Sequence, residues 1–398
     1  MSLPTSPNER PADSPLEVSV VMPCLNEADG LPYCIESIKT AFASSGLRGE
    51  IIVADNGSTD DSREIALSMG ARVVDVPQRG YGHALMKGID AARGALIVMG
   101  DADGSYDFAE IPNFVKSHKE GYDLIQGCRL PSGGGRVLPG AMPFMHRYVG
   151  NPLLSFFTRM MFATNIHDVY CGLRAFTPEL YQRLKQRCTG MEFAVEMIIK
   201  ARLLNERIGQ IPVTLHPDRR LSHPPHLRTY RDGWRTLRFF LLSSPKWLYL
   251  FPGLFLIALG ILGYILAIPG VSIGHATLGG NTLLCASLFV LCGYQAILFA
   301  IIAKTFAVTE QILPPDPLLD RFFRVMNLER GLFLSGLMFL AGAILILRVY
   351  IFWRGVHFGI LDYGQTLRLV VPGTTLITLS FQTAFSSFFV SMLGMGRK

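Results

Sequence analysis

The sequence predicts an α/β domain built on a mostly parallel sheet, followed by an all-helical transmembrane domain. Short apolar runs alternate with helical patterns through the first 246 residues, the order that is typical of parallel strands joined by right-handed crossovers. Beyond residue 246 the chain holds four long apolar segments. A third observation is an apolar run, residues 95–100, that ends in two carboxylates, Asp101 and Asp103, with one residue between them.

The elements of the first domain follow from apolar runs and helix signals. Strands are expected at residues 18–22, 51–54, 72–76, 95–100 and 123–126, where apolar residues gather in short runs. Helices are expected from about residue 30 to 45, at 60–69 and at 82–93. Residues 16–218 are therefore assigned to this domain. The first 15 residues, with four prolines and no apolar core, are expected to form a disordered tail.

Four spans are expected in residues 247–398, at about 247–268, 282–308, 331–353 and 369–393. Each is as long as the roughly 20 residues that cross a bilayer. The loop at 309–330 and the C-terminus carry Lys and Arg, whereas the loop at 269–281 has neither. This bias places the first domain in the cytoplasm, at a bacterial inner membrane or its equivalent. The alternative is that one span is a re-entrant or interfacial helix.

Composition limits the partners of the chain. The net charge of +6 is modest, and much of the excess lies in residues 219–246, which favours an anionic membrane surface over nucleic acid. From Thr229 onward, apolar residues recur there at helical spacing, so an interfacial amphipathic linker is expected. The alternative is an ordinary amphipathic helix packed on the first domain. The seven cysteines have neither metal-site nor disulfide spacing.

Acidic residues follow three of the expected strands. Glu27 comes soon after Pro23, Asp55 ends the second strand two residues before Gly57, and Asp101 and Asp103 follow the fourth. The carboxyl ends of parallel strands meet at one edge of a sheet, where ligands bind. Hard oxygen donors there suit Mg²⁺ or Mn²⁺ carrying a diphosphate. Asp55 could accept a hydrogen bond from a nucleobase and Glu27 from ribose hydroxyls, while Gly57 permits a tight turn.

These motifs, in this order, resemble those of the GT-A family 2 glycosyltransferases, and more closely the polyprenyl-phosphate (dolichol-phosphate) mannose and glucose synthases. The resemblance covers about residues 17–240. Three later pieces support it: Gly127-Cys-Arg129, Asp168-Val-Tyr-Cys-Gly-Leu-Arg-Ala-Phe176 and Met191-Glu-Phe193. Two positions depart from the family pattern: Asn56 stands where a second Asp is common, and Ser105 where several relatives have Gln.

The resemblance implies roles for individual residues. The nucleotide-sugar would contact Pro23, Glu27, Asp55, Gly57, Asp101 and Asp103. The divalent ion, Mg²⁺ or Mn²⁺, would bind Asp101 and Asp103, with Asp103 the firmer ligand. Arg129 and Arg174 would bind phosphates of the donor and of the acceptor. Asp103, Arg129, Asp168 and Arg174 are thus the candidate catalytic residues.

The reaction that the resemblance implies is the inverting transfer of a hexose from a GDP-mannose or UDP-glucose type donor to a polyprenyl phosphate. A lipid phosphate is already ionised, so it needs no strong general base. If the acceptor is instead a hydroxyl of a lipid or glycan, Asp168 is the candidate base; with a phosphate acceptor, Asp168 orients Arg174 or the sugar. A second alternative is a non-enzymatic glycolipid carrier or scaffold. Four spans exceed what anchoring requires, which leaves a homo-oligomer open.

Overall fold

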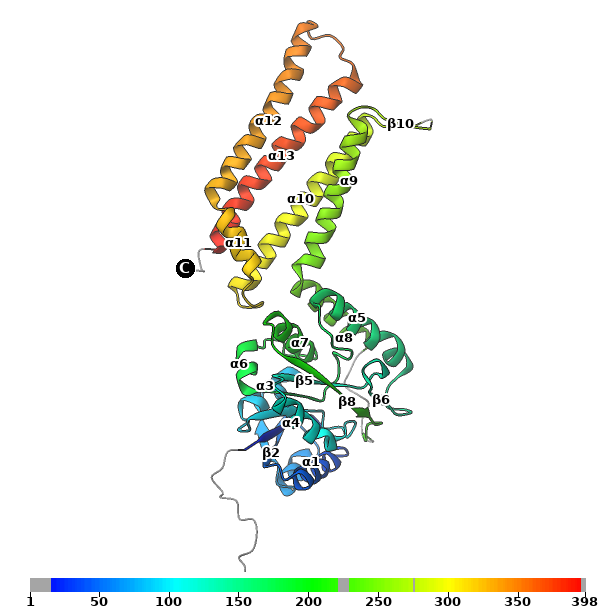
Figure 1. Ribbon diagram of the computed structural model, residues 1–398, viewed down its shortest axis with the longest axis vertical. Coiled ribbons are helices and arrows are strands. Elements are labelled where there is room, and N and C mark those ends of the chain that lie inside the picture. Colours follow the sequence, from blue (N-terminus) through cyan, green and yellow to red (C-terminus); the bar gives the residue numbers. More distant parts are fainter. Residues whose placement is uncertain (1–15, 221–228, 275, 395–398) are drawn as a thin grey trace, which may run out of the picture. The chain divides into compact units, whose positions relative to one another are not determined.

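The computed structural model describes residues 16–220, 229–274 and 276–394 (Figure 1). The tail expected at residues 1–15, and part of the linker expected at 219–246, lie outside the described residues. The chain forms two compact units that divide between Phe239 and Phe240, so the division falls within that linker.

A seven-stranded sheet forms the centre of the first unit, in the order β3-β2-β1-β4-β7-β5-β8. All neighbouring strands are parallel except β7, which runs antiparallel to β4 and to β5. The mostly parallel sheet is confirmed, and the reversed strand is the feature that the apolar runs did not predict. The strands are β1 (Val18–Cys24), β2 (Gly49–Asp55), β3 (Arg72–Asp75), β4 (Leu96–Met99), β5 (Leu124–Cys128), β7 (Arg174–Phe176) and β8 (Ile208–Pro212).

Helices cover both faces of this sheet, which is why its central strands are mostly apolar. Alternate side chains of β1 enter different cores: Val20 and Met22 pack in the cluster that includes Ile35 of α1, whereas Val21 packs in the cluster that includes Leu85 of α3. The helices are α1 (Leu31–Ser45), α2 (Ser62–Ser68), α3 (Tyr81–Asp90), α4 (Ile111–Lys119), α5 (Asn151–Phe162), α6 (Pro178–Leu184) and α7 (Phe193–Leu203). The first three confirm the helices expected before residue 95.

A second, two-stranded sheet joins β6 (Arg136–Val137) to β9 (Thr214–Leu215) in parallel. An antiparallel bridge between Tyr106 and Leu215 holds the end of β9 beside the loop that follows β4. From β9 the chain crosses the carboxyl edge of the sheet as far as Arg220, and α8 (Thr229–Ser243) is the next described element. This helix confirms the helical part of the expected linker, and its Trp234 side chain is exposed. Its contact with a membrane stays a prediction.

The second unit contains four helices that are long and apolar enough to cross a membrane. They are α9 (Phe251–Ala267), preceded by a π-helical turn at Lys246–Leu250, α10 (Gly280–Thr309), α12 (Leu328–Gly355) and α13 (Tyr363–Gly394). A short amphipathic helix, α11 (Pro317–Val325), lies between α10 and α12, and a small hairpin of β10 (Ser272–Ile273) and β11 (Ala276–Thr277) follows α9.

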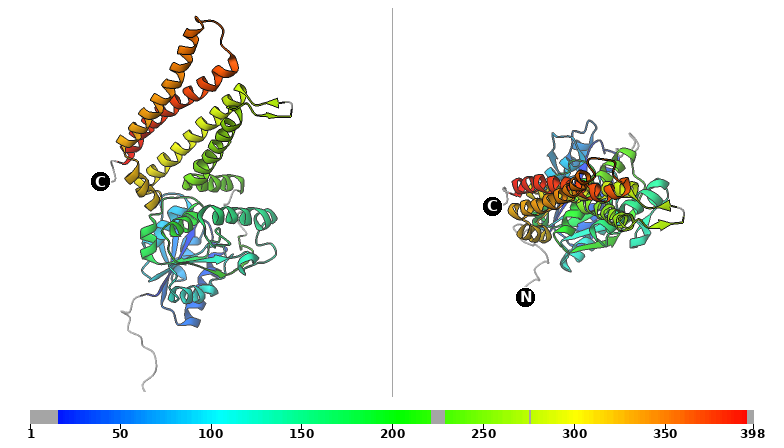
Figure 2. Two further views of the ribbon diagram at one scale, coloured as in Figure 1. Left: turned by 45° about the horizontal axis from the view of Figure 1, so that its top comes forward. Right: turned by 90° about the horizontal axis from the view of Figure 1, so that it is seen from above.

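The four long helices form two pairs, α9 with α10 and α12 with α13, and α10 also packs against α13 (Figure 2). Glycines let the backbones of each pair touch. A Cβ atom on Gly253 would lie 2.8 Å from the Gly293 carbonyl oxygen, and one on Gly342 would lie 2.7 Å from that of Gly373. Across the pairs, the Tyr294 hydroxyl lies 2.6 Å from that of Thr383.

Candidate functional site

The acidic residues that follow β1, β2 and β4 gather at the carboxyl edge of the main sheet, as the strand order requires. Glu27, Asp55 and Asp103 are all buried, with 5%, 7% and 8% of their surfaces exposed. Gly30, at the start of α1, makes the approach of the Asp101–Asp103 loop possible. A Cβ atom there would lie 2.6 Å from the carbonyl carbon of Asp103, closer than real contacts allow.

Arg220 is the residue that joins two of these carboxylates, and the sequence did not single it out. Its Nε and Nη2 atoms donate to the two oxygens of Glu27 at 2.9 and 2.7 Å. Its Nη1 atom lies 3.2 Å from Asp103 Oδ2. Burial opposes the charge, but the bonds to Glu27 and the attraction of Asp103 prevail and raise the pKa of the Arg220 guanidinium. A guanidinium therefore neutralises the place where a cation was expected.

Two backbone contacts bring Arg220 there. The amide of Arg219 donates to the carbonyl of Asp103 at 2.9 Å, and that of His216 donates to the carbonyl of Ser105 at 2.9 Å. The Arg219 guanidinium lies over the Tyr33 ring, 3.8 Å from its centre. The sequence places both arginines in a basic run and carries no local signal that separates them. The two arginines acquire different partners only because this segment pairs with the loop after β4.

Asp101 and Asp103 face different partners. The Oδ1 atom of Asp103 accepts hydrogen bonds from the amide and the hydroxyl of Ser105, at 3.0 and 2.6 Å. The Oδ1 atom of Asp101 accepts from the hydroxyl of Tyr81 at 2.9 Å. Burial, and then the charge of Asp103, raise the pKa of the Asp101 carboxyl to about 6. Ser105, which stands where several relatives have Gln, therefore binds the carboxylate of Asp103.

Asp55 and its turn are held by their own backbone. The Ser58 amide donates to Asp55 Oδ1 at 3.0 Å, and Gly57 between them has φ +87°, a conformation that favours glycine. Asn56, where a second carboxylate is common in the resembling family, has a structural role. Its amide group donates to the carbonyls of Val76 and Gln78, at 3.1 and 2.7 Å. A carboxylate could not donate either bond, so the departure from the family pattern has a physical reason.

Arg129 and Asp168 form a buried, bidentate ion pair. Arg129 Nε donates to Asp168 Oδ2 at 2.7 Å, and Nη2 donates to Oδ1 at 2.9 Å. The Arg129 amide adds a third bond to Oδ2 at 3.0 Å. Asp168 has no exposed surface. Burial works against the charged form of Arg129, but the Asp168 carboxylate holds the pKa of that guanidinium well above its ordinary value.

Arg174 lies away from any surface, which differs from the expected contact with a phosphate. It has no exposed area, and it donates to the carbonyls of Ala194 and Cys171 at 2.5 and 2.7 Å. Burial lowers the pKa of its guanidinium. Arg174 lies in β7, and its side chain is covered by α7, whose Ala194 carbonyl accepts one of its hydrogen bonds. In this arrangement Arg174 braces the loop at 168–173, and no part of its guanidinium is presented to a ligand.

That loop ends against Asp101. A Cβ atom on Gly172 would lie 2.6 Å from Asp101 Oδ2, and the Gly172 amide donates to the Tyr106 hydroxyl at 2.8 Å. Gln126 donates to the carbonyls of Asp168 and Cys171, both at 3.0 Å. The loop is thus bound along its length, and it forms one wall beside the Asp101 carboxylate.

The residues at the edge suit a divalent ion only together with a ligand. Within the part of the chain that the structure describes, no group of three His, Cys, Asp or Glu side chains is placed to hold a metal. Mg²⁺ is commonly bound through one or two carboxylates and completed by substrate phosphates and water. Asp101 and Asp103 fit that donor set, with the diphosphate supplying the remaining oxygens.

Two family models match the chain. One is described as glycosyl transferase family 2 and covers residues 19–185; the other is described as glycosyltransferase family 2 C-terminal transmembrane region and covers residues 301–394. The chain is 35% identical over 378 residues to the low-salt glycan biosynthesis hexosyltransferase of Haloferax volcanii. That match covers 95% of this chain and 89% of the relative.

Shorter relatives match the first unit. A dolichyl-phosphate hexose transferase of Haloferax volcanii is 28% identical over 198 residues, which is 50% of this chain and 82% of the relative. Among solved structures, glucosyl-3-phosphoglycerate synthase of Mycobacterium tuberculosis with Mn²⁺, UDP and glucosyl-3-phosphoglycerate is 26% identical, with a TM-score of 0.46. It covers 57% of this chain and 79% of that one.

Proposed function

This chain belongs to glycosyltransferase family 2, and we propose that it transfers a hexose from a nucleoside-diphosphate sugar to a polyprenyl phosphate. It is a membrane glycosyltransferase with an α/β catalytic domain and a helical transmembrane domain. The proposed donor is of the GDP-mannose or UDP-glucose type, and the proposed acceptor is a lipid phosphate. The similarity to a dolichyl-phosphate hexose transferase of Haloferax volcanii supports that acceptor.

The environment of Asp168 is the observation that carries the choice of acceptor. A hydroxyl acceptor needs a base within hydrogen-bond reach of its proton. Asp168 was the candidate, yet it has no exposed surface, and both of its oxygens bind Arg129. A phosphate monoester is already ionised at neutral pH and needs no base. The geometry therefore supports a phosphate as the nucleophile.

The donor would lie across the carboxyl edge of β1, β2 and β4. Asp55, at the end of β2, would accept from the nucleobase, and Pro23 and Gly57 shape the two turns around it. Glu27 has the reach for the ribose hydroxyls once Arg220 leaves its oxygens. In this arrangement Arg220 turns from Glu27 and Asp103 to the diphosphate, because a guanidinium binds phosphate oxygens in the same bidentate manner.

A divalent ion, Mg²⁺ or Mn²⁺, held by Asp103 and Asp101 together with diphosphate oxygens, would draw negative charge from the leaving group. The residues of the chain prepare that place. Ser105 fixes one oxygen of Asp103, which leaves the other facing the position of Arg220. Tyr81 fixes one oxygen of Asp101. Both carboxylates are thereby oriented before the donor arrives, so little reorganisation accompanies the reaction.

Arg129 would contact the acceptor phosphate, and Asp168 and Arg174 would position it. Two nitrogens of Arg129 are bound to Asp168, whereas among the described residues Nη1 has one contact, of 3.4 Å, with the Tyr106 hydroxyl. That edge of the guanidinium has donors left for a phosphate. Arg174 keeps the loop that carries Asp168 in place through its bonds to Ala194 and Cys171. The phosphate would then attack the sugar C1 from the face opposite the leaving diphosphate, with inversion.

Radiolabelled donors separate the candidate functions. Membranes that contain the protein are incubated with labelled GDP-mannose or UDP-glucose and with undecaprenyl or dolichyl phosphate. We expect a lipid product that mild acid hydrolyses, which is the behaviour of a sugar phosphodiester. Asp103→Ala should abolish this product, and Asp61→Ala, an exposed carboxylate outside the site, should not. An acid-stable product would point to a hydroxyl acceptor, and no donor turnover would point to a carrier or scaffold.

A further inference from the structure

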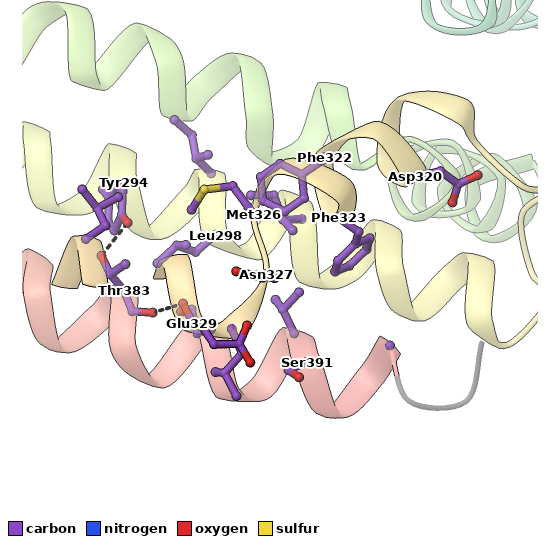
Figure 3. A pocket seen from close by; sticks show the side chains of 18 residues that line it. Tyr294, Leu298, Asp320, Phe322, Phe323, Met326, Asn327, Glu329, Thr383 and Ser391 are labelled. Atoms are coloured by element: carbon purple, nitrogen blue, oxygen red, sulfur yellow. Dashed lines mark hydrogen bonds between the residues drawn. The ribbon is translucent and has the colours of Figure 1, made fainter. Parts of the chain in front are cut away.

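The transmembrane unit contains a cavity of about 690 Å³ between α10, α11, α12 and α13 (Figure 3). Pockets that hold whole small ligands are roughly 300–1,000 Å³. The cavity is thus far larger than a packing defect. Leu298 of α10, Phe322 of α11 and Met326 beyond it line one side, and Thr383 and Ser391 of α13 line another.

The lining suits a hydrocarbon chain. Most of its surface is aliphatic or aromatic, and two of the α13 hydroxyls within it, those of Thr383 and Ser387, are bonded inside the protein. Thr383 donates to the Leu379 carbonyl at 2.7 Å and lies 2.6 Å from the Tyr294 hydroxyl. Ser387 donates to the Thr383 carbonyl at 2.7 Å. Hydroxyls that are satisfied in this way add little demand for a polar ligand. Met326 adds an unbranched, adaptable side chain that accommodates varied apolar shapes.

The charges around the cavity keep an anionic group outside it. Glu329 belongs to its lining and is exposed, so a phosphate would be repelled there. Arg321 and Arg324 of α11 are also exposed, on a helix whose Leu319 is buried. An amphipathic helix with this pattern lies at the level of lipid headgroups. The cavity therefore fits a lipid whose tail enters and whose phosphate stays beside α11.

The cavity lies at the end of the helix bundle where the chain enters from the catalytic unit. The start of α9, the end of α10, α11, the start of α12 and the end of α13 all belong to this end (Figure 1). Lys304 of α10 forms a 3.1 Å ion pair with Asp316, just before α11, which ties the loop to the bundle. A lipid held here lies on the side of the membrane where the catalytic unit is attached.

We propose that this cavity binds the isoprenoid chain of the acceptor lipid, a polyprenyl phosphate, while its phosphate remains outside. The inference rests on the proposed function. It also gives the bundle a purpose beyond anchoring: holding the lipid chain raises the concentration of the acceptor phosphate on the side of the membrane where the catalytic unit is attached.

Filling the cavity tests the proposal. Ser391→Phe places an aromatic ring in the lining, and Val390→Phe does so one residue away, in case the first variant folds poorly. Thr378→Phe is the matched control, because Thr378 is an exposed hydroxyl residue of the same helix outside the cavity. The purified full chain is assayed with undecaprenyl phosphate, which has eleven isoprene units, and with geranyl phosphate, which has two.

The KM for undecaprenyl phosphate should rise about tenfold in Ser391→Phe or Val390→Phe, the loss expected when about two methylene groups lose burial. The KM for geranyl phosphate and the kcat with either lipid should stay near those of the wild type, as should all constants of Thr378→Phe. A photoreactive polyprenyl phosphate should label peptides of α11 or α13 in the wild type, and less in Ser391→Phe.

Three results would overturn the inference. The first is an equal change in KM for both chain lengths in both cavity variants. The second is unchanged labelling when the cavity is filled. The third is a phospholipid that co-purifies with the wild type and the control, is lost from both cavity variants, and is not displaced by polyprenyl phosphate. A wild type that makes no polyprenyl product from either acceptor would instead reject the proposed function, and the inference with it.

Discussion

Replacing Arg220 with glutamine should tighten the binding of Mn²⁺ alone, before any nucleotide is added. Arg220 lies between Glu27 and Asp103, at 2.7 and 3.2 Å from their oxygens, and 12% of its side chain is exposed. An ion that binds Asp103 must first displace this guanidinium. Arg220→Gln removes the competing charge and leaves a neutral amide of shorter reach.

The magnitude follows from the contact that the ion has to break. A hydrogen bond to a charged group contributes about 1.5–3 kcal/mol. Removing one such competitor at Asp103 should strengthen Mn²⁺ binding by about 10- to 100-fold. The ion-free variant should also unfold more easily, by about 1–3 kcal/mol, because Glu27 and Asp103 stay buried without their partner. Added Mn²⁺ should restore that loss.

Free Mn²⁺ is measured by electron paramagnetic resonance during titration of the full chain in detergent, without nucleotide. Arg219→Gln is the matched control: it removes the same charge from the neighbouring residue, whose guanidinium lies over Tyr33. Thermal unfolding with and without Mn²⁺ provides the second readout. Donor turnover by Arg220→Gln should fall even though the ion binds more tightly, because the arginine is no longer available to the diphosphate.

Equal Mn²⁺ affinity in Arg220→Gln and the wild type would refute the reasoning. It would mean that the ion binds without displacing the guanidinium, and that the Asp103 oxygen facing Arg220 is not its ligand. An equal increase in Arg219→Gln would assign the effect to net charge and not to the contact.

Three further variants test the supports of the site. Asp168→Asn should lower the free energy of unfolding by about 3–5 kcal/mol, because it leaves the buried Arg129 charge unpaired; a shift below 1 kcal/mol in denaturant unfolding would contradict this. Asn56→Asp should lower the same quantity by about 2–3 kcal/mol, since two donated hydrogen bonds are lost, and an unchanged melting temperature would argue against that role. Gly172→Ala should reduce kcat about 100-fold with a small change in melting temperature, because its Cβ atom would displace the Asp101 carboxylate; steady-state kinetics would test this.

The sheet and the spans could be predicted because a buried strand or a membrane span has apolar residues along its own length. Both faces of the central strands are covered, so β4 is entirely apolar and β1 is interrupted by Ser19 alone. The four spans can be recognised in the sequence by their length and apolar composition. Strand β7 has no apolar run by which it could be predicted. It has three residues, one of which is Arg174, and it lies between two longer strands.

The sequence by itself determined which acidic residues end strands, since each strand ends where its apolar run stops. Their meeting at one edge followed from parallel order alone. Only the tertiary structure decided what each carboxylate contacts. Arg220 reaches Glu27 across 193 positions of sequence, and Arg129 reaches Asp168 across 39. The physical reason is that an ion pair depends on distance in space and on exclusion of water. Spacing along the chain gives neither quantity. Arg220, which the sequence places in a basic run, therefore proved to be the counter-ion of Glu27 and Asp103.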